Sequence, residues 1–243
     1  MKRNIKLLIE YDGTDFVGWQ RQLNGRTVQE EIEKALKTIT LEEIGIVGAG
    51  RTDSGVHARG QVANFNTSSI LTLNDFYRGL NGIVPDDIVI RKAEEADEKF
   101  SARYSATARE YRYVISKNPT AIDRKYCWQI GYQFDIEKMN RIALSILEMQ
   151  DFQSFCKSDS EVKHYLCQIY ESRWYEEDSK LIYLVRANRF LQGMVRALVG
   201  TMVDIGRGHV LEDQFQQIVK SKDRSKAGQA APARGLFLDR VTY

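Results

Sequence analysis

The sequence predicts an α+β fold with two similar-sized halves. Strand-like alternation and helical periodicity are mixed along the chain without the strict β-α-β order of a parallel α/β protein. The balance of charge reverses near residue 100, where an acidic stretch ends and residues 99–125 carry seven Lys or Arg against two acids. A length of 243 residues allows one or two domains. We therefore expect an N-terminal α+β domain over residues 1–105 and a C-terminal α+β domain over residues 106–243, with predominantly antiparallel sheets flanked by helices.

Strands are predicted where apolar residues alternate or form short runs between turn residues. In residues 5–11, the side chains of Ile5, Leu7 and Ile9 share one face. The same reasoning predicts strands at 44–47, 61–67, 87–93, 109–117, 165–175, 181–187 and 236–243. The polar residues Glu176–Ser179 turn the strands before and after them into a hairpin.

Helices are predicted from capping residues followed by an apolar stripe. After the loop 12–26, Thr27 and Glu30 form a capping-box pattern ahead of a helix that runs to about Thr38. Thr72 again resembles a helix start. Further helices are predicted at 72–82, 135–149, 189–205 and 211–220.

Composition excludes several classes of protein. The chain has 35 Lys or Arg and 33 Asp or Glu, a net charge of +2, and 43% hydrophobic residues, which argues against a disordered chain and against a nucleic-acid binder that works by bulk charge. The three cysteines lack CxxC spacing and the three histidines lack HExxH spacing, so we expect no disulfide scaffold and no metal site. No apolar run reaches the ~18 residues of a membrane span, and the N-terminal run is too short for a signal peptide. We expect a cytoplasmic protein with no membrane partner.

The segment Gly48–Gly60 is the strongest candidate for a functional loop. Four glycines stand among Arg51, Asp53, His57 and Arg59, which favours an ordered loop that another segment or a ligand approaches closely. The alternative is a hairpin connection with a solvated Asp-Ser-Gly turn. A phosphate loop is excluded, because there is no GK[ST] and Asp53 stands where GxGxxG needs glycine.

Two further clusters carry arginine. In Phe100–Tyr113 arginines alternate with aromatics, as in surfaces that hold phosphates and stack bases. The alternative is a half-buried strand in which Tyr111 and Tyr113 are ordinary core aromatics. In the predicted helix from residue 189, one face carries Arg189, Gly193, Arg196 and Gly200 and would let another segment approach. The alternative is an arginine on a solvated face.

Taken in order, these clusters resemble the bacterial tRNA pseudouridine synthase A family. The matching motifs are YDGT (11–14), GWQRQ (18–22), TVQE (27–30), GAGRTDSGVHARGQVANF (48–65), FSAR (100–103), ATAREYRY (106–113), MVR…VG (194–200) and GLFL (235–238). The resemblance implies the pseudouridine synthase fold with an active-site cleft between the halves, no cofactor, and a homodimer that acts on tRNA. It also implies isomerisation of uridine to pseudouridine at positions 38–40 of the anticodon stem-loop.

The resemblance also implies roles for particular residues. Asp53 matches the catalytic aspartate, Tyr111 the tyrosine against the target base, and Arg196 the basic residue paired with the aspartate. Arg51 is a weaker candidate for that pairing. The remaining expected substrate contacts are His57 and Gln61, and the expected RNA-backbone contacts are Arg59, Arg103, Arg109, Gln20 and Arg21. An ionised carboxylate acts as nucleophile or base, and a neighbouring arginine favours the ionised form. The sequence leaves open whether Asp53 attacks the sugar, attacks the base or abstracts a proton.

Three places depart from the family pattern: Ser54, Leu191–Gly193 and the segment around Cys167. In the family we expect an arginine near the position of Cys167. These departures suggest a narrower or altered set of tRNA targets. One alternative function is a tRNA-binding module or RNA chaperone without turnover. A second is a nucleotide-binding enzyme that uses the glycine-rich loop.

Overall fold

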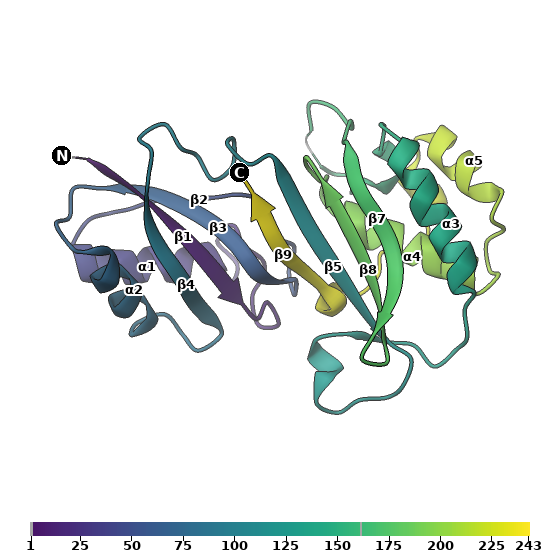
Figure 1. Cartoon of the computed structure of the whole chain (residues 1–243), viewed down its shortest axis with the longest axis horizontal. Coiled ribbons are helices and arrows are strands. Elements are labelled where there is room, and N and C mark those ends of the chain that lie inside the picture. The colour runs from purple at the N-terminus through teal and green to yellow at the C-terminus, as the bar shows by residue number, and fades with distance from the viewer. Residues whose placement is uncertain (1, 161) are drawn as a thin grey trace. The chain divides into compact units, whose positions relative to one another are not determined.

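The computed structural model describes residues 2–160 and 162–243 and divides into two compact units (Figure 1). The first unit comprises Met1–Thr107 and Phe237–Tyr243, and the second comprises Ala108–Leu236. Each unit mixes helices with a largely antiparallel arrangement of strands, which confirms the α+β class.

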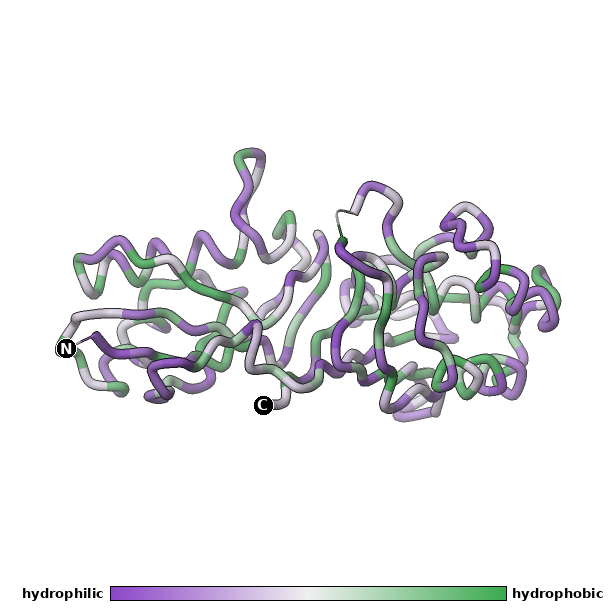
Figure 2. Tube along the Cα trace, turned by 90° about the horizontal axis from the view of Figure 1, so that it is seen from above, coloured by the Kyte–Doolittle hydropathy of each residue, from purple (hydrophilic) through white to green (hydrophobic). Residues whose placement is uncertain are grey.

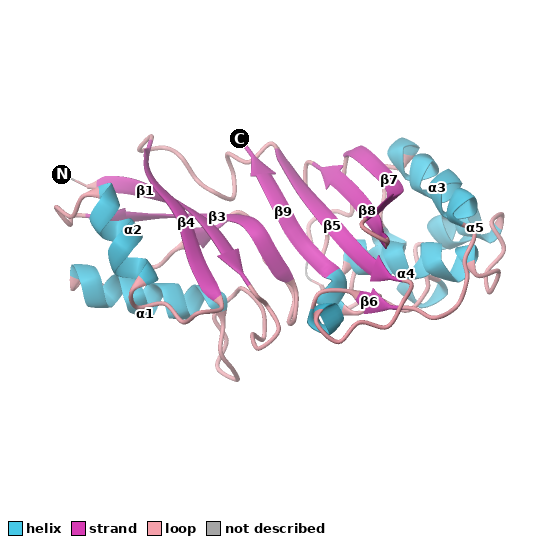
Figure 3. Ribbon diagram, turned by 60° about the horizontal axis from the view of Figure 1, so that its bottom comes forward, coloured by secondary structure: helices cyan, strands magenta, loops and turns pink. Residues whose placement is uncertain are grey.

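The first unit is built on strands in the order β4-β1-β3-β9. β1 (Arg3–Tyr11) pairs antiparallel with both β3 (His57–Thr67) and β4 (Ile88–Ala96). The short β2 (Val47–Gly48) pairs with β3, and β9 (Leu236–Thr242) runs parallel to the start of β3. Figure 3 shows α1 (Val28–Thr40) and α2 (Leu73–Asn81) close together on one side of these strands.

Side-chain caps explain where the two helices of this unit begin. Thr27 Oγ1 accepts a hydrogen bond from Glu30 N at 3.3 Å, so that half of the predicted capping box is present. The Glu30 carboxylate lies 3.3 Å from Lys34 Nζ, one turn further along α1. At α2 the capping box is complete, because Thr72 and Asp75 each bond the other's backbone N–H.

The second unit has strands in the order β5-β8-β7, all antiparallel neighbours. The strands are β5 (Ala108–Ser116), β8 (Lys180–Ala187) and β7 (Ile169–Glu177), and the short β6 (Trp128–Gln129) pairs with β5. The helices are α3 (Ile136–Ser145), α4 (Met194–Gly206) and α5 (Gln214–Ser221). Most of α4 is buried, and Trp174 of β7 donates to Met202 Sδ of α4 at 3.3 Å. Short 3₁₀ turns lie at Asp123–Lys125, Ile146–Glu148, Gln153–Phe155, Arg224–Lys226 and Ala233–Gly235.

Several predicted boundaries were wrong. The predicted loop 48–60 ends early, because His57–Gly60 already belong to β3, where Ala58 pairs with β1 and His57 and Ala58 pair with β9. The predicted helix 189–205 begins only at Met194, since Gly193 adopts a left-handed conformation with φ 71°. The apolar periodicity of the sequence continues through such a residue, but a helical backbone cannot, so the helix starts after it. Smaller shifts affect the strand predicted at 44–47, the helix at 135–149, the hairpin strand at 165–175 and the helix at 211–220.

The last strand joins the first unit although it ends the chain. β9 pairs with β3 at His57 and Ala58, and a Cβ on Gly60 would lie 2.4 Å from Asp239 O. Only glycine at position 60 permits this approach. The division into a domain 1–105 with the aspartate loop and a domain 106–243 with the tyrosine and arginine stays a prediction.

Hydrophobic and hydrophilic segments alternate along both units. Figure 2 shows hydrophobic stretches recurring along the strands and helices and interrupted by hydrophilic ones. Within the part of the chain that the structure describes, no helix combines the length and apolar character needed to cross a membrane.

Candidate active site

The loop that carries Asp53 is fixed through its backbone. Trp19 N donates to Thr52 O at 3.1 Å on one side of the aspartate, and Gly55 N donates to Phe16 O at 3.2 Å on the other. Val56 N closes the turn by donating to Asp53 O at 3.1 Å. The peptide groups around Asp53 are therefore tied, while its side chain is only partly buried. This arrangement fixes the backbone from which the Asp53 carboxylate projects.

Two glycines of the facing loop 12–26 make this contact possible. A Cβ on Gly13 would lie 2.0 Å from Val56 O, and one on Gly18 would lie 2.8 Å from Thr52 O. Gly18 also has φ 116°, which side chains rarely tolerate. The YDGT and GWQRQ motifs thus supply the surface on which the aspartate loop rests.

Buried polar side chains secure the start of the same loop. The hydroxyl of Tyr11 and Oγ1 of Thr52 are 2.7 Å apart and buried, and Gln61 Nε2 donates to Gly50 O at 3.0 Å. Burial raises the pKa of Tyr11 well above its ordinary value, so the phenol stays protonated and available for this bond. Gln61 is fully buried, and its observed contacts hold the loop backbone.

His57 is also buried rather than open to solvent. Its ring stacks on Phe237 of β9 at 4.7 Å, and its Nδ1 accepts a hydrogen bond from Gly13 N at 3.0 Å. Asp12 Oδ1 lies 3.0 Å from the same nitrogen. In these contacts the histidine positions the 12–14 turn under the aspartate loop. The role of His57 in substrate binding stays a prediction.

Three predicted site arginines of this unit are exposed, unlike these buried groups. Arg51, Arg59 and Arg103 are exposed, with the guanidinium of Arg59 stacked 4.8 Å from Phe237 and near Asp239. Arg103 lies over the ring of Tyr104 at 5.4 Å. Such accessible guanidinium groups suit contacts with phosphates.

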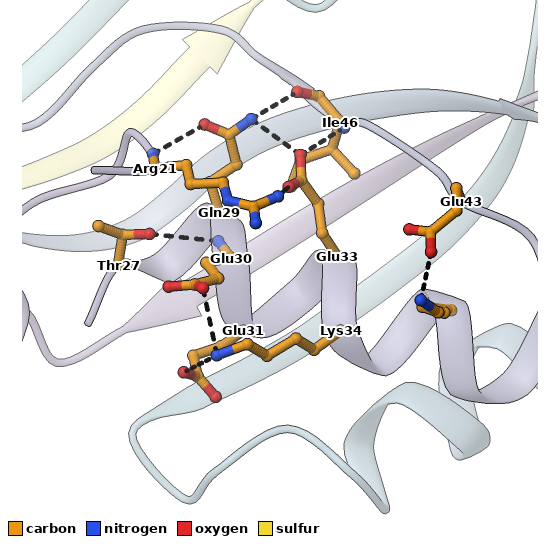
Figure 4. A network of polar contacts seen from close by, with 10 residues as sticks. Arg21, Thr27, Gln29, Glu30, Glu31, Glu33, Lys34, Glu43 and Ile46 are labelled. Atoms are coloured by element: carbon orange, nitrogen blue, oxygen red, sulfur yellow. Dashed lines mark hydrogen bonds and ion pairs between the residues drawn. The ribbon is translucent and has the colours of Figure 1, made fainter. Parts of the chain in front are cut away.

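Gln20 and Arg21 lie on an exposed loop at the start of α1. Figure 4 shows how the arginine side of this loop is held: Arg21 N donates to Gln29 Oε1, and its guanidinium faces Glu33 at 3.9 Å. Gln29 Nε2 and Ile46 N both bond Glu33 Oε1, at 2.8 and 3.0 Å. The network joins the loop to α1 and to the segment before β2.

In the second unit Tyr111 and Tyr113 project from the same face of β5. The ring of Tyr111 meets Phe190 edge-on at 5.1 Å, and it retains a small exposed area. Tyr113 is completely buried and donates to Pro232 O at 2.8 Å, so the interpretation of this residue as a core aromatic is confirmed. Gly235 of the GLFL motif fits against it, since a Cβ there would lie 2.7 Å from the Tyr113 ring.

Arg196 is tied into the structure through its own side chain. Its Nε donates to Ala231 O at 2.7 Å, and Ala231 N donates back to Arg196 O at 3.0 Å. One turn along α4, a Cβ on Gly200 would lie 1.8 Å from Gln229 O. The arginine–glycine face of the helix therefore accepts another chain segment, as the sequence predicts for these two residues.

The other members of that predicted face do not join it. Arg189 and Gly193 precede α4, so the four-residue face predicted from position 189 was wrong in its first half. Arg109 on β5 donates to Asn188 O at 2.8 Å and so helps to hold the chain just before that turn.

Each unit thus assembles one part of the predicted site. Asp53, His57 and Gln61 lie together in the first unit, while Tyr111, Tyr113 and Arg196 belong to the second. The pairing of Asp53 with Arg196 joins residues of different units and stays a prediction. Sequence reasoning did not single out Tyr11, Thr52 or Phe190 for support of these residues. The glycines at positions 13 and 18 are a signal that could have shown the close approach of loop 12–26 to another segment.

No group of three or more His, Cys, Asp or Glu side chains in residues 2–160 and 162–243 is arranged to hold a metal ion. The chemical groups gathered around the aspartate loop are a carboxylate, tied backbone amides and exposed guanidinium groups. Such groups favour an anionic polymer and acid–base or nucleophilic chemistry.

Comparisons with known proteins find a matching family model and relatives that align over nearly the whole chain. The family model described as tRNA pseudouridine synthase matches residues 7–105 and 149–243. Proteins named tRNA pseudouridine synthase A from Acetivibrio thermocellus and Clostridium acetobutylicum are 43% and 42% identical, each over 99% of this chain and 100% of the relative. The relative of that name from Chlorobaculum tepidum is 43% identical over all of this chain and 98% of its own length.

Among solved structures, the archaeal box H/ACA sRNP Nop10-Cbf5 complex matches with a TM-score of 0.34 and 11% identity, over 82% of this chain and 43% of that one. The family model and the full-length relatives agree with each other, and the motifs they span include the aspartate loop and α4. The chain belongs to the tRNA pseudouridine synthase family and is an enzyme of the isomerase class.

Proposed function

We propose that this protein converts uridine to pseudouridine in tRNA, at positions 38–40 of the anticodon stem-loop, with Asp53 as nucleophile or base. The observation that carries the proposal is the aspartate loop, whose backbone is tied on both sides of Asp53 while the carboxylate stays partly accessible. A catalytic group gains from such fixed geometry, because small displacements cost rate. The full-length relatives supply the substrate class.

The reaction rearranges one nucleotide without adding or losing atoms overall. The bond between uracil N1 and C1′ breaks, the base turns, and a bond forms between C5 and C1′. The C5 hydrogen leaves as a proton and N1 gains one. A carboxylate serves either as the nucleophile that holds the separated fragment or as the base that accepts a proton.

The substrate must leave its base stack to reach the carboxylate. Extruding a base costs a few kcal/mol, and one aromatic stack returns roughly 1–3 kcal/mol. We assign that stack to Tyr111, whose ring keeps some exposed area. Arg196 would pair with Asp53, and Arg51, His57 and Gln61 would complete the substrate site.

Contacts to the RNA backbone would come from cations and amides, of which all but the half-buried Arg109 are exposed. The proposed set is Arg59, Arg103, Arg109, Gln20 and Arg21. The net charge is only +2, so binding depends on where these side chains lie rather than on bulk charge. The homodimer and the cytoplasmic location belong to the same proposal and rest on the family resemblance.

Tritium release tests the reaction directly. A tRNA transcript labelled at uridine C5 should lose tritium to water with the wild-type protein and not with Asp53→Asn. Asp86→Asn is the matched control, because Asp86 is an exposed aspartate in a turn of the same unit. Pseudouridine mapping in tRNA from cells with and without the gene then locates the sites. No release across the whole tRNA pool, together with tight tRNA binding, would replace this proposal by a binding or chaperone function.

A further inference from the structure

The loop Gln20–Gly25 is exposed at every residue and carries one large apolar side chain. Leu23 has a relative exposure of 103%, the highest among the large hydrophobic residues in the described part of the chain. Its neighbours Arg21, Gln22 and Asn24 are all hydrogen-bonding residues. A leucine held wholly in water forgoes the stabilisation that its burial would provide.

The base of this loop is joined to the aspartate loop. Val17 N donates to Arg26 O at 3.0 Å and so draws the two ends of the loop together. Trp19, next to the exposed residues, is buried and donates from its backbone to Thr52 O, one residue before Asp53. Gln22 Nε2 also turns back to Val17 O at 3.1 Å. The leucine therefore stands on a support shared with the catalytic carboxylate.

Exposure alone does not distinguish Leu23, because other apolar side chains are nearly as exposed. Ile70 has a relative exposure of 97%. The hydrogen bonds of its loop run to Arg3 and Glu42. The Leu23 loop itself bonds to Gln29 and Val17. Trp19, directly before the loop, donates to Thr52 O next to Asp53. Location separates the two residues and makes Ile70 a matched control.

The surroundings of Leu23 favour a nucleic-acid base step over a protein or membrane surface. A protein or lipid partner would be met by several adjoining apolar residues, whereas here a single apolar side chain is flanked by one guanidinium and several amides. A base stack presents apolar faces bordered by phosphates, which matches this pattern.

We propose that Leu23 is a wedge that inserts between bases beside the target uridine and favours its extrusion, with Arg21 and Gln20 holding the adjacent backbone. The inference rests on the proposed action on tRNA and adds a positioning residue to it. The wedge fills the space that the extruded base leaves, and so offsets part of the cost of unstacking.

The test follows base extrusion and isomerisation separately in the full-length protein. A tRNA transcript with 2-aminopurine next to the target uridine reports unstacking by fluorescence, and C5 tritium release reports the reaction. We expect Leu23→Ala to lower the fluorescence rise and to slow single-turnover tritium release about tenfold, since several buried methyl or methylene groups are lost. The Kd for tRNA should stay within about threefold, because phosphate contacts dominate affinity.

Two comparisons separate a wedge from a structural effect. Leu23→Met should restore most of the rate, and Ile70→Ala should behave as wild type. A transcript whose target uridine faces another uridine is already weakly stacked, so the Leu23→Ala defect should shrink on it.

The outcomes divide the two proposals. If wild type is active and Leu23→Ala matches Ile70→Ala in rate and fluorescence, the wedge is overturned while the isomerisation stands. If no tritium is released but the fluorescence rise depends on Leu23, the wedge stands and the isomerisation fails. If wild type gives neither signal, both are overturned.

Discussion

The aspartate loop of the first unit and the arginine helix of the second are fixed by different kinds of hydrogen bond. Around Asp53, backbone amides and carbonyls of residues 16–19 and 52–56 hydrogen-bond to one another. Arg196 itself bonds Ala231 O and thereby fastens the segment that crosses α4. The difference is that main-chain hydrogen bonds fix the loop around Asp53, whereas the side chain of Arg196 is itself one of the bonds that fix its surroundings.

The largest expected effect is on activity in the first unit. Asp53→Asn should slow tritium release by at least about 10²-fold, because an amide serves as neither base nor nucleophile. Its Tm should stay near that of wild type, since Asn has the size of Asp and the main-chain hydrogen bonds on both sides of position 53 are kept. Thermal unfolding beside the activity assay checks both. A clear fall in Tm would show that the carboxylate is itself a support and would break the comparison.

The next effect comes from disturbing the support of Asp53 without touching it. Gly13→Ala places a Cβ 2.0 Å from Val56 O and should displace the aspartate turn, with a loss of kcat of roughly 10- to 100-fold. Gly50→Ala is the control, because a Cβ at Gly50 meets nothing within 4 Å. Equal kcat values for the two variants would mean that the turn tolerates displacement.

In the second unit the effect should be on stability. Gly200→Ala brings a Cβ to 1.8 Å from Gln229 O and should lower the free energy of unfolding by about 1–3 kcal/mol, as overpacking does. Tm should fall by roughly 2–4 °C for each kcal/mol. Gly131→Ala, which meets nothing within 4 Å, should leave Tm unchanged. A Gly200→Ala protein as stable as this control would show that the 228–231 segment moves freely away from α4.

The smallest effect is in thiol reactivity, which reports on the second unit alone. Cys127, Cys156 and Cys167 all lie there and are buried. Burial raises the pKa of Cys167 to about 11, so at pH 8 its thiol stays protonated and labelling needs local opening. The pKa of Cys167 is therefore higher in the folded state than in the unfolded chain. Its contribution to the free energy of unfolding is fully present below the ordinary thiol pKa and is lost as the pH rises through about 11.

Gly200→Ala should therefore speed labelling by a disulfide reagent at pH 8, and Gly13→Ala should not. The rate of colour development under native conditions measures this, with urea-unfolded protein as the upper limit. Faster labelling in Gly13→Ala would mean that the two units do not open separately.

Much of the fold follows from local pattern. The alternation of Ile5, Leu7 and Ile9 places them in the core of β1, and Thr27 and Thr72 begin helices as their capping patterns predict. These signals succeed because burial and capping depend on neighbouring residues. They fail at Gly193 and His57. A left-handed turn and a long-range strand pairing decide the boundary there.

The site was predictable to a lesser degree. The motif 48–60 and the face with Arg196 and Gly200 identified the two segments that carry the candidate site residues. The glycines in them predicted that another part of the chain comes close. Neither periodicity nor spacing could say that Gly13 lies on Val56, or that His57 stacks on Phe237 near the end of the chain. Those contacts depend on segments that are distant in sequence.

The sequence by itself determined the α+β class, the starts of the capped helices and the residue types of the reacting groups, because each of these is set by local chemistry. Only the tertiary structure decided that Asp53 is held by its backbone, that Arg196 is held by its side chain and that Leu23 stands exposed above the aspartate loop's support. Packing between distant segments chooses which polar groups become anchors and which stay accessible, and a linear pattern does not encode that choice.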